Sequence, residues 1–83
     1  MGEVIAVFRI LPDSPDGFDA VSKKVRALKP ARLDEEPVAF GLKAIIATFI
    51  IPDEGGSMDQ LENRLGSIKG TQSVETVRVS RSL

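Results

Sequence analysis

A chain of 83 residues, 42% of them hydrophobic, has the size and composition of one small globular domain, so we predict a single domain over residues 1–83. The absence of cysteine and histidine excludes disulfides and thiolate metal sites and removes the commonest general base and metal ligand. The net charge of −1 argues against non-specific binding to nucleic acid or a membrane, which favours a basic surface. We therefore expect no metal, no cofactor, no direct contact with nucleic acid and no membrane association.

The first elements along the chain are a predicted strand and a predicted helix. Residues 3–11 (EVIAVFRIL) alternate between two faces, and the face predicted to lie in the core is formed by Val4, Ala6, Phe8 and Ile10. Ser14 is suited to cap a helix that has Pro15 at its first position and is ended by Pro30. The apolar residues of this helix recur at helical spacing: Phe18, Val21, Val25 and Leu28.

Two strands of opposite character are predicted next. Residues 31–40 (ARLDEEPVAF) are charged and contain Pro37, which predicts an edge strand because proline cannot donate to a sheet ladder. Residues 42–51 (LKAIIATFII) are apolar on both faces, which is typical of a central strand. The segment 52–56 (PDEGG) then breaks the chain.

A second helix and a last strand complete the chain. Ser57 and Gln60 have the spacing of a capping box at the start of the helix. The apolar stripe of the helix comprises Met58, Leu61, Leu65 and Ile68. Residues 73–80 (SVETVRVS) predict the final strand, with a bulge near Thr76, where the alternation of the valines changes phase.

The order of the predicted elements, β-α-β-β-α-β, indicates an α+β fold of the ferredoxin-like kind. Because βαβ crossovers are right-handed, both helices are expected on one face of a four-stranded antiparallel sheet. The other face is left open, with Ile5 and Val7 on it. The N-terminus shows no secretory signal, and the longest apolar stretch is shorter than the ~20 residues that span a bilayer, so we expect a cytoplasmic protein.

The residues alone leave the function open among several binding modules. No phosphate-binding P-loop pattern is present, and the acidic groups at 34–36 and 53–54 are most simply read as solvated loop and edge charge. The lack of histidine and cysteine also disfavours an enzyme. Ferredoxin-like domains also bind RNA through aromatics on the central strands, but here the third strand offers only Phe49. An RNA-binding or small-ligand-sensing module is therefore the alternative to a protein-binding domain.

One long stretch carries a specific resemblance. Residues 35–56 (EEPVAFGLKAIIATFIIPDEGG) and residues 67–75 (SIKGTQSVE) resemble the archaeal elongation factor 1-beta family, and the similarity extends over the whole chain. The resemblance implies a guanine-nucleotide exchange factor for the translational GTPase elongation factor 1-alpha, which carries aminoacyl-tRNA to the ribosome. Such a protein has no chemical active site: it promotes GDP release so that GTP can rebind, and it thereby supports protein synthesis.

The most telling part of the resemblance is the segment Ala39-Phe40-Gly41-Leu42-Lys43. In the family the aromatic residue at this hairpin tip is an apolar anchor that fills a partner pocket, and Phe40 occupies that position. The resemblance thus implies that Phe40, Ala39, Gly41 and Lys43 bind the partner, with Gly41 allowing a tight turn. Without the resemblance, a Phe40 folded back over the open sheet face is equally compatible with the residues.

The C-terminus matches the family less closely. Eukaryotic members have a lysine just before the last residue, and it reaches toward the Mg²⁺ site of the partner. This chain ends in VRVSRSL, with Ser82 in that place and Arg81 as the nearest cation. The last strand also lacks an aspartate that archaeal members have where TVRV stands here. Arg81 and Ser82 are therefore the candidates for a second contact, and a solvated terminus is the alternative.

Overall fold

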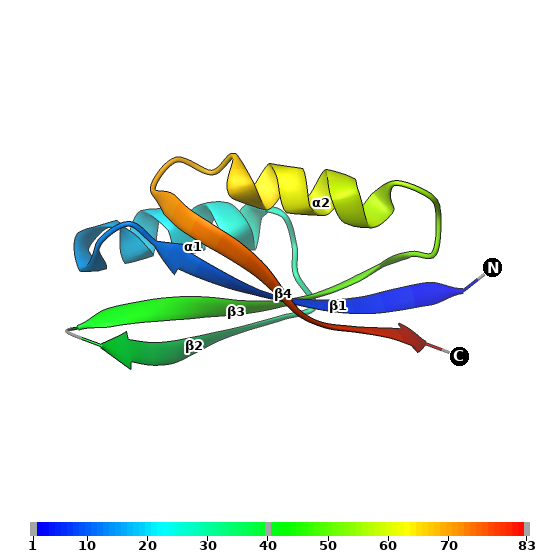
Figure 1. Cartoon of the computed structure of the whole chain (residues 1–83), viewed down its shortest axis with the longest axis horizontal. Coiled ribbons are helices and arrows are strands. Elements are labelled where there is room, and N and C mark those ends of the chain that lie inside the picture. The colour runs from blue at the N-terminus through cyan, green and yellow to red at the C-terminus, as the bar shows by residue number, and fades with distance from the viewer. Residues whose placement is uncertain (1, 40, 83) are drawn as a thin grey trace.

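The computed structural model describes residues 2–39 and 41–82 (Figure 1). Its elements follow the predicted order, with a short 3-10 helix added before the first α-helix. They are β1 (Glu3–Pro12), η1 (Pro15–Gly17), α1 (Phe18–Ala27), β2 (Arg32–Ala39), β3 (Leu42–Pro52), α2 (Ser57–Gly66) and β4 (Thr71–Ser82). The four strands form one antiparallel sheet in the order β2-β3-β1-β4, and both helices cover the same face of it (Figure 1). The predicted ferredoxin-like α+β fold is confirmed, with β2 at an edge and β3 inside the sheet.

Both helices begin differently from the prediction. Ser14 precedes η1 instead of α1, and its hydroxyl makes no capping hydrogen bond; the Gly17 N–H donates to the Ser14 carbonyl over 3.1 Å. The predicted capping box at Ser57 is wrong, because Ser57 is already the first residue of α2. The N-cap is Gly56, with a φ of 88°, and the Gln60 N–H donates to its carbonyl over 2.9 Å. The chain therefore enters α2 through a left-handed turn that glycine adopts easily.

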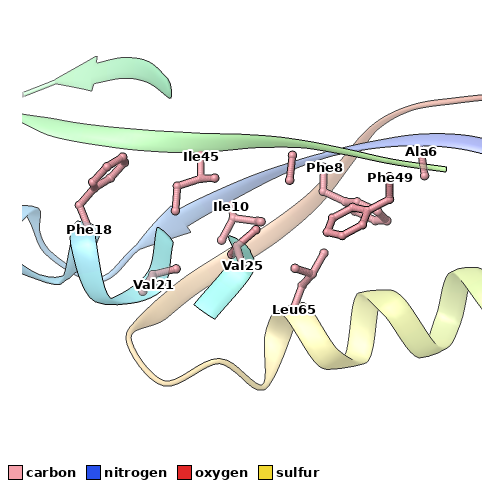
Figure 2. Packing of buried hydrophobic residues seen from close by; sticks show 10 residues of the cluster. Ala6, Phe8, Ile10, Phe18, Val21, Val25, Ile45, Phe49 and Leu65 are labelled. Atoms are coloured by element: carbon pink, nitrogen blue, oxygen red, sulfur yellow. The ribbon is translucent and has the colours of Figure 1, made fainter. Parts of the chain in front are cut away.

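The hydrophobic core lies between the sheet and the helices (Figure 2). Its buried residues are Ala6, Phe8, Ile10, Phe18, Val21, Val25, Ile45, Ala47, Phe49 and Leu65. The rings of Phe8 and Phe49 meet edge to face with their centroids 6.0 Å apart, a favourable aromatic geometry. Phe49 is only 4% exposed, so it cannot present its ring to an RNA base on the open side of the sheet. The predicted core face of residues 3–11 is confirmed. Both predicted helical stripes also hold, with Leu28, Met58, Leu61 and Ile68 packed against the core.

The opposite face of the sheet carries neither of the two helices (Figure 1). Ile5 lies opposite Ile50 and Val7 lies opposite Thr48. Ile50 is 50% exposed, whereas Ile5 and Val7 are half-buried. Two ion pairs lie on this face, Arg9–Glu36 at 2.9 Å and Arg32–Asp34 at 2.8 Å. Glu75 and Arg78 of β4, opposite Arg9 and Val7, are exposed on it as well. The open face is thus a narrow apolar strip among charged side chains.

Strand β4 contains the predicted bulge. Val7 lies opposite Arg78 and Phe8 lies opposite Thr76, which leaves Val77 as the additional residue. Pairing then continues beyond the predicted end of the strand, as far as Ser82 opposite Glu3.

Neither α-helix has the length and apolar character of a membrane span.

Candidate functional site

The two predicted contact regions lie at opposite ends of the molecule. The β2–β3 connection is at one end of the long axis, which measures 42 Å, and the C-terminus is at the other (Figure 1). Strand β3 runs between them from Leu42 to Pro52, and a strand of this length covers about 33 Å at ~3.3 Å per residue. The structure therefore does not bring the predicted residues together in one site. It separates them into two sites, which one partner reaches only if it extends along the whole domain.

At the first end, β2 and β3 stay paired as far as Ala39 opposite Leu42. Gly41 has a φ of 79°, in the left-handed region that favours glycine, and a Cβ built there meets no atom within 4 Å. Gly41 is therefore required by the turn and not by packing. Ala39 is exposed beside it, whereas Phe40 lies outside the described residues, so its role as an anchor stays a prediction.

The sequence reasoning missed Val38 at this end. The register shifts between Pro37 and Ala39, and Val38 in between is 42% exposed. An apolar residue that follows the acidic run of the edge strand, close to the turn, was the available signal. Val38 adds apolar surface next to the turn, where the predicted anchor residue is located in the sequence.

Ion pairs hold both faces of the hairpin near its tip. On the side of the helices, Lys43 Nζ lies 3.2 Å from Glu35 Oε1 and 4.8 Å from the centroid of the Phe18 ring. On the open side, Arg9 Nε donates to Glu36 Oε1 over 2.9 Å. The ammonium of Lys43 is thus directed at residues of its own chain, although a partner contact was expected for it.

At the second end, the predicted cation is placed on a paired strand. Arg81 lies opposite Val4, and Ser82 is the last residue of β4. Arg81 Nη1 lies 3.4 Å from Asp53 Oδ2, and the Arg81 side chain is 78% exposed. Because an exposed ion pair is weak, Arg81 can leave Asp53 at little cost and turn to another anion.

The chemistry that these two ends offer is binding. In the part of the chain that the structure describes, no group of three or more His, Cys, Asp or Glu side chains is arranged to hold a metal ion. One end offers apolar surface on a tight turn, and the other offers an exposed positive charge in a weak ion pair. Such a pair of features suits the recognition of a large partner with an apolar pocket and an anionic site.

Residues 5–81 match the model of a protein family described as the EF-1 guanine nucleotide exchange domain. The chain belongs to this family. Relatives called Elongation factor 1-beta match this chain over nearly their whole length. The protein of Methanoregula boonei is 37% identical, with 96% of this chain and 98% of the relative covered. The protein of Methanosarcina barkeri is 38% identical, with 98% and 99% covered. The protein of Natronomonas pharaonis is 37% identical, also with 98% and 99% covered.

The predicted resemblance is thereby confirmed, and these three relatives are archaeal, as expected. Guanine nucleotide exchange for elongation factor 1-alpha is the function that the family and the relatives support.

Proposed function

We propose that this chain promotes GDP release from elongation factor 1-alpha, so that GTP can rebind and aminoacyl-tRNA delivery can continue. The observation that carries the proposal is the family match over residues 5–81. In this role the chain needs no chemical active site and no contact of its own with nucleic acid or a membrane, and it works in the cytoplasm. It must bind the nucleotide-free GTPase more tightly than the GDP-bound form, since equal affinity for both forms shifts nothing.

The hairpin end supplies the anchor. Phe40, flanked by Ala39 and Gly41, is the residue whose ring fills an apolar pocket of the GTPase. The open space around Gly41 and the exposure of Val38 support this proposal, because both leave the turn accessible to a large partner.

The C-terminal end supplies the charge. Arg81 exchanges Asp53 for the anionic groups around the Mg²⁺ of the GTPase and thereby competes with the metal ion electrostatically. The exposed ion pair that has to open contributes about 0.2–1 kcal/mol, which is small beside the gain at an anionic site. Ser82 follows Arg81 and takes part in the same contact.

Binding free energy gained at the hairpin end helps the C-terminal end to promote GDP release. A thousandfold acceleration of GDP release corresponds to a barrier lower by about 4 kcal/mol. An apolar anchor at the hairpin holds the domain on the GTPase, and the cation then acts where the nucleotide is bound. The anchor thus improves affinity, whereas the cation favours the nucleotide-free state.

The test is the release of labelled GDP from archaeal elongation factor 1-alpha, with and without this protein. We expect a large acceleration that saturates with the concentration of the chain. Lys23→Ala is a suitable control, because Lys23 is exposed on α1 and belongs to neither of the two predicted contact regions. Unchanged GDP release over a wide concentration range would refute the proposed function.

A further inference from the structure

We infer that Lys43 is a positioning residue for exchange, which holds the tip of the β2–β3 hairpin against α1 from within the chain. The inference rests on the proposed function and changes the role of one residue in it. A lysine beside a binding turn is expected to contact the partner, but the Lys43 side chain, although 45% exposed, contacts Glu35 and Phe18 of its own chain.

The first observation is the face of β3 on which Lys43 lies. Lys43 alternates with Ile45 and Ala47, which are 1% and 0% exposed and belong to the core. Its side chain therefore continues the helix-covered face of the strand toward the tip. Phe18, the first residue of α1, is 7% exposed and extends toward β3 (Figure 2), and the Lys43 ammonium lies 4.8 Å from the centroid of its ring. This is the geometry of a cation–π contact.

The second observation is the carboxylate partner. Glu35 of β2 lies opposite Ile45 in the ladder, one diagonal step from Lys43, and its Oε1 is 3.2 Å from Lys43 Nζ. Diagonal neighbours on one face of a sheet are close enough for long side chains to interact. One ammonium group therefore connects β2, β3 and the start of α1, two residues away from Gly41.

The third observation concerns the opposite face. The Arg9–Glu36 pair joins β1 to β2 across the open side of the sheet, so it braces the hairpin within the sheet and does not reach a helix. Strand β1 pairs with β3 only as far as Ile10 opposite Ile45, so the hairpin beyond Ile45 is a two-stranded ribbon with a register shift at Val38. Two-stranded ribbons are weakly stable by themselves. A contact from its tip to α1 lowers the freedom of the turn before the partner arrives, and preordering of this kind improves affinity.

The experiment compares Lys43→Met, Glu35→Gln and the double variant. Methionine retains the apolar stem of Lys43 and removes its charge, whereas Lys43→Arg retains both the charge and the contact with the ring. We expect Lys43→Met to raise the half-saturating concentration in GDP release by about five- to tenfold, because it removes both a weak ion pair and a cation–π contact. Glu35→Gln removes only the ion pair and should raise that concentration by about two- to fivefold. The double variant should be no worse than Lys43→Met, and Lys43→Arg should stay near the unmodified chain.

A second measurement needs no GTPase. Hydrogen exchange of the free protein should become faster at the amides of Ala39 and Leu42 in Lys43→Met and in Glu35→Gln. The control is Arg32→Met, which removes an exposed ion pair of 2.8 Å from the other end of β2 and should change neither readout. If the unmodified chain failed to accelerate GDP release, the proposed function would be refuted. Amide protection would then still test whether the Lys43 contacts order the tip of the hairpin.

Two results would overturn the inference. If Lys43→Met weakened exchange while Glu35→Gln left it unchanged or improved it, Lys43 would contact the partner directly. In that case the loss of the Glu35 carboxylate would only free the Lys43 ammonium for the partner. If Lys43→Met changed neither GDP release nor the protection of the tip, the contact would have no role in positioning.

Discussion

At the scale of single residues, the hairpin turn contains one residue that the fold requires, Gly41, beside the residues predicted to bind the partner. Gly41 is needed for its φ of 79° and touches nothing that a Cβ would disturb. Gly41 therefore serves the turn and not the packing of the domain, and we expect substitutions at the predicted contact residues beside it to affect exchange more than stability.

Phe40→Ala should leave the domain folded and weaken exchange. Truncating an interface anchor costs about 2 kcal/mol or more, which is over tenfold in affinity for the GTPase, whereas an exposed phenylalanine contributes well under 1 kcal/mol to stability. The matched control is Phe8→Ala, because Phe8 is fully buried against Phe49 and should lose about 3–5 kcal/mol. Thermal melts and GDP release of both variants separate the two roles. A large drop in the Tm of Phe40→Ala would place Phe40 in the core.

Arg81→Ala should slow GDP release, and removal of residues 81–83 should slow it at least as much. The reason is the loss of the cation that competes with Mg²⁺. The melting temperature should hardly change, because the Arg81–Asp53 pair is exposed. Arg78→Ala on the same strand is the control, since Arg78 is also exposed but lies before the C-terminal end. If Arg81→Ala and the chain without residues 81–83 both released GDP at the normal rate, the C-terminal end would be dispensable and the hairpin alone would promote exchange.

At the scale of elements, the turn between α2 and β4 determines how closely the last strand approaches the first helix. Gly70 has a φ of 96°, and a Cβ there would come within 3.2 Å of the Val21 Cγ2 atom of α1. The Thr71 N–H donates to the Ile68 carbonyl over 3.2 Å, and the Asp13 N–H donates to the Gly70 carbonyl over 2.7 Å. This tight turn joins both helices to the start of β4.

Gly70→Ala should therefore destabilise the domain by about 1–3 kcal/mol, since alanine is strained at this φ and would press on Val21. Gly55→Ala is the matched control, because a Cβ at Gly55 meets nothing within 4 Å and its φ is not left-handed. Urea denaturation of the two variants gives the difference directly. Equal midpoints would show that the loop relaxes without cost.

Alternation and helical spacing were enough to predict the elements, the core face of β1 and the bulge in β4. Such patterns repeat within one strand or helix, so several residues indicate the same element and the same buried face. The start of α2 was not predictable in the same way, because Gly56 caps it through a backbone conformation and not through a side chain. The contacts of Lys43 and Arg81 depend on strand register and helix docking, which bring together residues that are distant in the sequence. The candidate residues were therefore identified, but their partners were not.

At the scale of the whole molecule, the domain is a rod of 42 × 20 × 18 Å with one candidate contact at each end. Its interior is a continuous core, and the strands run along the long axis (Figure 1). The two ends are too far apart to influence each other through direct contacts. Their effects on binding should consequently be separable.

The double variant Phe40→Ala with Arg81→Ala tests this separation. Substitutions more than about 10 Å apart usually add within about 0.3–0.5 kcal/mol. We expect the logarithm of the exchange rate to fall by the sum of the two single effects. The rates are measured at a subsaturating concentration of each variant. A double variant no slower than the weaker single one would mean that the two ends act in one coupled step.

The length of β3 has a consequence for how the chain can vary. A single unbroken strand fixes the distance between the two contact regions, so this distance must match the distance between the two corresponding places on the partner. Adding two residues to each strand of the hairpin would preserve which side chains face the helices, yet increase the distance by about 7 Å. Additions at 53–56, where the chain turns after β3, would leave the distance unchanged. Insertions and deletions should accordingly be tolerated at 53–56 and rejected between Leu42 and Pro52, even when they do not disturb its folding.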